Sequence, residues 1–163
     1  MTQKTQKTKK IKKTKLWPPK YYRGLTKKQA LERKKEIQRF GAMNWTNSKA
    51  YVGFKTDKYV KTKKKSSYTL QWNKLFPDAK SLKERSAVTG VPLKYIKHVS
   101  RKALAAWRSG HRPGATQQQW TYPRVSSFLL CGKTHYTADA AVVRRARKES
   151  AGARKWFKRC PLK

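Results

Sequence analysis

The side chains of this chain that could do chemistry are few, and their spacing matches no familiar catalytic pattern. The seven acidic residues are scattered along the chain: Glu32, Glu36, Asp57, Asp78, Glu84, Asp139 and Glu149. The three histidines and two cysteines show no CxxC or HxxxH spacing, so a zinc site would have to be assembled from distant residues. Gly110 and Gly114 flank an Arg-Pro pair without the Lys-Ser/Thr of a phosphate-binding loop. We therefore predict no enzymatic activity, no metal, no cofactor and no small-molecule substrate.

Cations dominate the composition instead. The 163 residues include 43 Lys and Arg against seven acids, which gives a formal net charge of +36. Because self-repulsion of this size destabilises a compact chain, we expect a polyanionic or acidic partner. Nucleic acid is one candidate, since each neutralised phosphate releases counterions. Acidic neighbouring proteins in an assembly are the other, and composition leaves the two open.

The candidate residues for binding a partner or nucleic acid fall in basic clusters, some with an aromatic residue. His111 and Arg112 lie in a loop between two Trp-bearing segments, where with Arg108 they either lock the core or grip a partner. Trp156, in a cationic segment, either stacks on bases or docks in a pocket of a neighbouring protein. The full set is Lys9, Lys10, Lys12, Lys13, Trp17, Lys63, Lys64, Lys65, Lys94, Lys97, Arg101, Arg108, His111, Arg112, Arg144, Arg145, Arg147 and Trp156.

Four segments are predicted to carry these residues. Residues 1–20 are a basic low-complexity arm, and residues 21–80 are a basic linker region with a helix over 27–40 and a short helix near 67–76. Residues 81–149 are expected to form a helical core domain, followed by a basic aromatic C-terminal arm over 150–163. Capping-box pairs mark three helix starts, at Thr26, Ser81 and Thr116. The fold class expected is mainly α, a small helical domain with extended basic N- and C-terminal arms.

The first two helices of the predicted core resemble a helix-turn-helix. Such units use residues at fixed spacings to pack their two helices together. The residues at these spacings here are Ser86, Gly90, Val91, Ile96 and Val99. If the unit reads DNA, the residues that face the groove are Lys94, Tyr95, Lys97, His98 and Arg101. Arg85 and Thr89 depart from the pattern, because apolar residues are commoner there, and Leu93 is expected on the exposed side. An ordinary helical hairpin is the alternative.

The C-terminal half contains further signals. Pro123 should kink or restart the helix that Thr116 begins, and Thr137 is expected to cap a last helix with Asp139 in its first turn. Cys131 and Cys160 are expected to act as small apolar residues in a reducing compartment, with one optional disulfide as the alternative. No apolar run approaches the roughly 20 residues of a membrane span, so none is predicted.

Several stretches resemble an uncharacterised small basic domain family of large double-stranded DNA viruses of algae, phycodnavirus-like, which also occurs in some phages. The resemblance rests on Thr89-Gly90-Val91-Pro92, on residues 105–116, and on Gln119-Trp120, Arg124-Val125, Ser127-Phe128 and Gly132-Lys133-Thr134. Tyr21-Tyr22-Arg23-Gly24-Leu25 and Lys65-Ser66-Ser67 also fit, and Pro123 departs from the family pattern. The resemblance implies a virus, but no activity that can be assigned to particular residues.

The function expected on these grounds is that of a non-enzymatic structural virion protein, a minor capsid protein of a large DNA virus. Its basic arms would bind acidic neighbouring proteins, namely major capsid and other minor capsid subunits, or face the genome side of the shell. Trp17, Trp156 and Phe157 favour this role as spaced anchors. The expected location is the virion, and the host cytoplasm or nucleus during assembly. The alternative is a DNA-binding protein, helix-turn-helix-like or non-specific, with a genome-packaging or core role.

Overall fold

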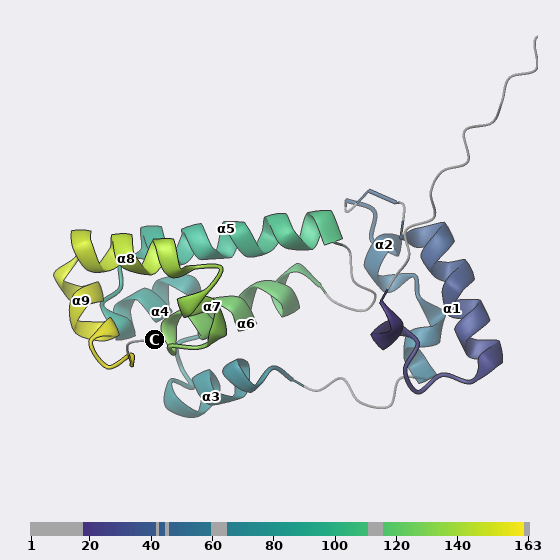
Figure 1. Ribbon diagram of the computed structural model, residues 1–163, viewed down its shortest axis with the longest axis horizontal. Helices are drawn as coiled ribbons and strands as arrows, with labels where there is room; N and C mark the ends of the chain where they lie inside the picture. The colour runs from purple at the N-terminus through teal and green to yellow at the C-terminus, as the bar shows by residue number, and fades with distance from the viewer. Residues whose placement is uncertain (1–17, 42, 45, 60–64, 111–115, 162–163) are drawn as a thin grey trace, which may run out of the picture. The chain divides into compact units, whose positions relative to one another are not determined.

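The computed structural model describes residues 18–41, 43–44, 46–59, 65–110 and 116–161, which belong to two compact units, residues 1–60 and 61–163 (Figure 1). Every regular element within these described ranges is a helix, so the protein is mainly α, as the sequence predicted. Most of the predicted arm over 1–20 lies outside the described residues. So do nine candidate residues: Lys9, Lys10, Lys12, Lys13, Trp17, Lys63, Lys64, His111 and Arg112.

The first unit is built on α1 (Lys27–Phe40), with α2 (Lys49–Val52) and two 3-10 turns, η1 (Pro19–Tyr21) and η2 (Lys55–Tyr59). The helix expected over 27–40 is confirmed, and Thr26 and Gln29 form the predicted reciprocal capping box at its start. Ile37 packs against Phe54 in a small core. Arg33 is only 2% exposed and donates a 2.6 Å hydrogen bond to Asp57, so one cation of α1 is part of this core.

The second unit contains α3 (Ser67–Leu75), α4 (Leu82–Thr89), α5 (Leu93–Gly110), α6 (Gln117–Leu129), α7 (Lys133–Tyr136), α8 (Ala140–Glu149) and α9 (Ala151–Phe157). The short helix expected near 67–76 is confirmed as α3. α6 continues through Pro123 without restarting, and it packs along both α5 and α3. α8 begins at Ala140, later than expected, since the Thr137 hydroxyl donates back to the Lys133 carbonyl of α7 and does not cap α8.

The core of the second unit extends beyond the predicted segment 81–149 at both ends. α5 packs against α4, α6 and α8, while α3 lies on α6 and α9 on α4 and α8. Trp72 of α3 and Phe157 of α9 are fully buried in the same apolar cluster as Ile96, Val99 and Phe128. The compact unit therefore begins near residue 61 rather than residue 81, and α3 is part of the core rather than of a linker.

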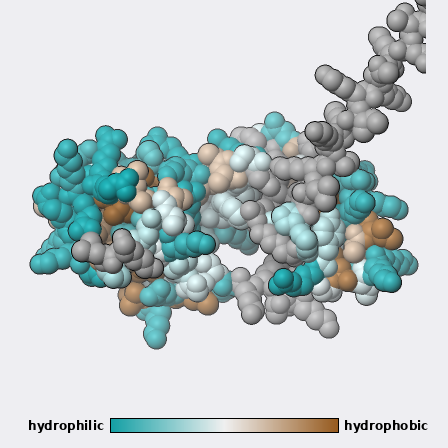
Figure 2. Space-filling model, in the orientation of Figure 1, coloured by the Kyte–Doolittle hydropathy of each residue, from teal (hydrophilic) through white to brown (hydrophobic). Residues whose placement is uncertain are grey.

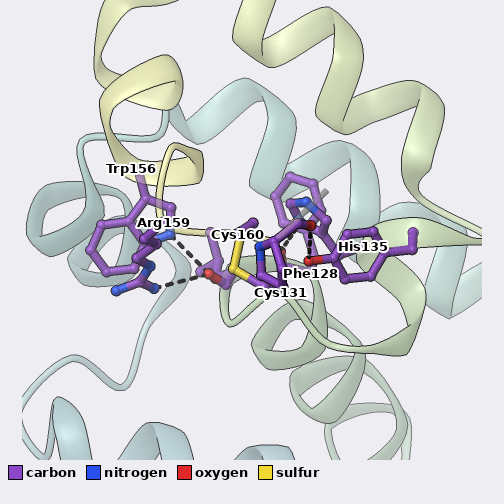
Figure 3. Close-up of a disulfide and its surroundings, with 9 residues drawn as sticks. Phe128, Cys131, His135, Trp156, Arg159 and Cys160 are labelled. Atoms are coloured by element: carbon purple, nitrogen blue, oxygen red, sulfur yellow. Dashed lines mark hydrogen bonds between the residues drawn. A yellow bond between two sulfur atoms is a disulfide. The ribbon is translucent and has the colours of Figure 1, made fainter. Parts of the chain in front are cut away.

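The segment 150–163 was expected to be an extended arm, and this prediction is wrong for residues 150–161. The Trp156 indole donates a 2.9 Å hydrogen bond to the Leu129 carbonyl, and Cys160 forms a disulfide with Cys131 (Figure 3). The cysteines are thus paired, which is the alternative that the sequence left open, and both also pack in or against the apolar core. Beside them lies buried His135, with its Nδ1 3.0 Å from the Phe128 carbonyl oxygen, and burial lowers the pKa of this imidazole.

Candidate nucleic-acid interface

α4 and α5 join through a short turn over residues 90–92, as the helix-turn-helix pattern in the sequence predicted. Gly90 ends α4 in the left-handed region with φ of +69°, a conformation that favours glycine. The Ser86 hydroxyl donates a 2.7 Å hydrogen bond to the Val91 carbonyl and ties α4 to the turn. Val91, Ile96 and Val99 are fully buried. Three of the five positions that the sequence pattern assigned to packing between the two helices therefore face the core, whereas Ser86 is half-buried and Gly90 is exposed.

The two departures from the pattern also occupy core positions, because Arg85 is 3% exposed and Thr89 is 5% exposed. The Arg85 guanidinium carbon lies 4.5 Å from the Trp72 ring centroid and 4.9 Å from that of Tyr122. Its Nη1 donates a 2.8 Å hydrogen bond to the Ser126 hydroxyl, and burial lowers the pKa of Arg85 to about 10. Arg85 thus fills an apolar position by stacking between two aromatic rings.

Four cations line the outer face of α5, and we call Lys94, Lys97, Arg101 and Arg108 the α5 stripe. All four are exposed. At 3.6 residues per turn they fall within an arc of about 60° and extend along roughly 21 Å of helix. In the described part of the chain no ion pair engages Lys97 or Arg101, whereas Lys94 pairs with Glu149 at 3.0 Å. Leu93, expected on the exposed side, is half-buried.

Tyr95 was expected on the same face, and this prediction is wrong. It is 4% exposed, and its hydroxyl donates a 2.5 Å hydrogen bond to Glu149. In the helical projection Tyr95 lies about 100° from Lys94, on the side that meets α8. Tyr95 therefore links α5 to α8 and is not available to a groove.

A cleft of about 320 Å³ lies between α5 and α8. Its lining comes from two segments far apart in sequence, and consists of Lys94, Tyr95, His98 and Arg101 from α5 and Ala141, Val142 and Arg145 from α8. The fold thus brings together three of the predicted binding residues, Lys94, Arg101 and Arg145. Figure 2 shows hydrophilic side chains covering much of the visible face around α8 and α9, at the left of the picture.

Glu149, at the end of α8, is the carboxylate beside this cleft. It accepts hydrogen bonds from Lys94 Nζ at 3.0 Å, from the Tyr95 hydroxyl and from Arg145 Nε at 2.8 Å. These bonds, with that from Tyr95 the strongest influence, lower the pKa of Glu149 to about 2. The same carboxylate raises the pKa values of Lys94 and Arg145. Three cations against one carboxylate leave the cleft with an excess of two positive charges.

The remaining described candidates do not join this cleft. Arg144 is exposed on α8, Arg147 is half-buried, and Lys65 is exposed just before α3. Trp156 was expected to stack on bases or dock in a neighbour, but its ring packs in the molecule's own core and carries the Arg159 guanidinium 3.4 Å from its centroid. The Trp156 side chain therefore contributes to the core and is only partly exposed.

Sequence reasoning missed two functional contributions. Glu149 carried no signal, because its partners Lys94 and Tyr95 are more than 50 residues away. Asp139 was assigned to a helix dipole, yet it is fully buried and accepts two hydrogen bonds from Arg124, at 2.8 and 3.0 Å. Lys102 of α5 approaches the same carboxylate at 3.3 Å. Asp139 thus links the start of α8 to both α5 and α6.

Two further observations concern only the described residues. There, no three His, Cys, Asp or Glu side chains come together as a metal site would require. Of the helices described, none is long and apolar enough to cross a membrane.

Neither the comparison with curated proteins nor the comparison with solved structures finds a match. A family model does match, over residues 18–145, and this range includes the described elements from η1 to α7, the whole α5 stripe and α8 as far as Arg145. More than half of the chain is covered, and the described part of the match spans the helix-turn-helix unit and most of the cleft. The chain therefore belongs to DUF5824, a family of unknown function.

Proposed function

We propose that this protein binds duplex DNA without catalysing a reaction, and that the α5 stripe is its principal contact surface. The observation that carries the proposal is the exposed row of cations on the second helix of a helix-turn-helix unit. Lys97 and Arg101 belong to this row of cations, and neither forms an ion pair in the described structure. Second helices of such units enter the major groove and contact base edges and phosphates.

The dimensions of α5 suit this role. An α-helix is about 10–12 Å wide with its side chains, and the major groove is about 12 Å wide. The stripe of roughly 21 Å offers cations along nearly four helical turns. Lys97 and Arg101 lie one turn apart, so both can donate to a groove edge or to flanking phosphates at the same time.

A structural virion role is the second candidate, and the resemblance to a viral family is what favours it. In this role the protein is a minor capsid component whose basic surface binds acidic capsid subunits. Its sequence argument depended on anchors at Trp17, Trp156 and Phe157. Phe157 is buried in the protein's own core and Trp156 packs against it, whereas Trp17 lies outside the described residues. DNA binding explains the net charge of +36 without such anchors, and it is compatible with a place inside a virion.

Binding of the full chain to a duplex of about 20 base pairs, at roughly 50 and 200 mM salt, tests the proposal. We expect a steep loss of affinity with salt. The double substitution Lys97→Gln/Arg101→Gln should reduce the slope of log affinity against log salt by about 2, because two cations that contact phosphates are lost. Fluorescence anisotropy with a labelled duplex measures both quantities.

Lys74→Gln/Lys155→Gln is the matched control, since it removes the same charge from exposed positions on α3 and α9. An equal effect of both double variants on DNA affinity would show that binding depends on total charge and not on a defined contact surface. Absence of DNA binding at low salt would refute the proposal. Fractionation of virions that contain the protein would then separate the two candidates: a capsid component stays with the shell, whereas a DNA-bound component leaves with the genome.

A further inference from the structure

The carboxylate of Glu149 lies beside the basic cleft between α5 and α8. Three donors converge on it, from Lys94, Tyr95 and Arg145. If the surface acted only through its summed charge, Glu149 would simply weaken the attraction for an anion. The geometry indicates a different contribution, because the carboxylate holds one side chain of α5 and one of α8 toward the same cleft.

Lys94 and Arg145 need such support. Their side chains are 64% and 70% exposed, so without Glu149 both would sample many rotamers in solvent. Each uses one N–H on the carboxylate. An ammonium group has three N–H donors and a guanidinium group has five, so two donors of Lys94 and four of Arg145 remain for a ligand. Glu149 therefore orders the two cationic side chains and leaves most of their N–H donors for a ligand.

The rest of the cleft has the chemistry of a phosphate site with a sugar neighbour. Arg101 and His98 add donors on the α5 side, and Ala141 and Val142 form an apolar wall on the α8 side. A guanidinium group can donate two parallel hydrogen bonds to phosphate oxygens. A volume of about 320 Å³ lies at the lower end of the range for small ligands and accommodates one sugar-phosphate unit.

We propose that the cleft between α5 and α8 is a phosphate-binding site that seats one sugar-phosphate unit of the DNA backbone, with Glu149 as its positioning residue. The inference rests on the proposed DNA binding for the source of the phosphate. α8 then becomes a second DNA-contacting element, and it fixes the register of the α5 stripe in the groove. The excess of two positive charges in the cleft suits a phosphate group.

The effect of Glu149→Gln on DNA affinity distinguishes a surface that acts through summed charge from one in which Glu149 positions the cations. Removal of a negative charge should strengthen DNA binding if only summed charge matters. Loss of positioning should weaken it, and we expect roughly three- to tenfold weaker binding, because two long side chains must now be ordered by the ligand. Thermal unfolding of the variant, measured in parallel, shows that the fold is retained.

Asp78→Asn is the matched control, because Asp78 is an exposed acid of the same unit in the turn after α3. It should leave DNA affinity unchanged or slightly raised. If Glu149→Gln binds DNA as tightly as Asp78→Asn or more tightly, Glu149 is not a positioning residue and the inference is overturned.

Inorganic phosphate provides an independent probe of the cleft. Titrated into the full chain, it should shift the NMR signals of residues 94–101 and 141–149 above all others, and Arg101→Gln/Arg145→Gln should abolish these shifts. Duplex DNA should displace the phosphate. Shifts of equal size at all exposed cations would overturn the site.

The failures of the two proposals are distinguishable. Phosphate binding in the cleft without any DNA binding would refute the proposed function. The cleft would then remain a phosphate-binding site whose ligand is not DNA. Salt-dependent DNA binding that is unaffected by substitutions at residues 145 and 149 would refute the cleft and leave the proposed function standing.

Discussion

Buried arginines are a feature of both units. Arg33 neutralises its charge with Asp57, while Arg85 has aromatic rings and a serine hydroxyl as its neighbours. A guanidinium group is planar and weakly hydrated, so its faces stack on rings at a lower desolvation cost than an ammonium group would incur. In a chain with this excess of cations, arginine can thus serve at positions that other helix-turn-helix units give to apolar residues.

Substitution of Arg85 tests this interpretation. Arg85→Ala should lower the free energy of unfolding by about 2–5 kcal/mol, because it leaves a void between Trp72 and Tyr122. Arg85→Leu should cost less than about 1.5 kcal/mol, since an apolar side chain of similar volume restores packing and no buried charge remains. Urea unfolding of both variants measures the difference. An equal loss in the two variants would mean that the charge of Arg85, rather than its volume, stabilises the core.

At the scale of elements, α9 determines how the helix-turn-helix turn is supported. Gly152 of α9 faces the turn so closely that a Cβ atom there would lie 2.2 Å from the Gly90 carbonyl oxygen. The neighbour is backbone, and Gly90 is held in the left-handed region, so the contact cannot be relieved by rotation of a side chain. The close approach places a constraint on the turn that positions the start of α5.

We therefore expect Gly152→Ala to lower the free energy of unfolding by about 1–3 kcal/mol through overpacking, although alanine normally favours a helix. Chemical unfolding followed by circular dichroism measures the change. Ala151→Ser, at the exposed position just before it, is the control and should change stability by less than about 0.5 kcal/mol. A stabilised Gly152→Ala variant would show that α9 does not pack on the turn as described.

At the scale of the whole molecule, few acids remain to balance the cations. Five of the seven acids already have partners within the two units: Glu36 with Thr56, Asp57 with Arg33, Glu84 at the α4 cap, Asp139 with Arg124, and Glu149 with Lys94 and Arg145. The net charge of +36 already counts all seven acids, so internal pairing leaves it unneutralised. This excess of positive charge favours a polyanionic partner, such as the DNA of the proposed function.

The Cys131–Cys160 disulfide joins residues 29 positions apart, and it ties the segment after α9 to the turn after α6. Restriction of the unfolded chain by a loop of this length stabilises the fold by about 3–4 kcal/mol. Reduction with dithiothreitol should lower the free energy of unfolding by this amount, as measured by urea titration. Cys131→Ser/Cys160→Ser should show the lower stability with and without reductant. Identical stability of the oxidised and reduced protein would exclude a stabilising bond.

The sequence by itself determined the features whose physical cause lies within a few residues. The three capping boxes join residues three positions apart, so the starts of α1, α4 and α6 were predictable. The turn at Gly90 and the exposed positions of Lys94, Lys97 and Arg101 follow from backbone preference and helical period in the same way. These features define the helix-turn-helix unit and most of the α5 stripe.

Tertiary structure decided everything that depends on contacts distant in sequence. The basic C-terminal segment looked like an arm because its charge conceals the apolar pair Ala153 and Phe157, which α9 buries against the core. The pairing of Cys131 with Cys160 and the stacking of Arg85 likewise need α9, α3 and α6 in place. The cleft lies between α5 and α8, and it brings together Lys94 and Arg145, whose shared partner Glu149 lies 55 residues from Lys94. A pattern of charge along one helix cannot show which cations a second helix will bring beside it.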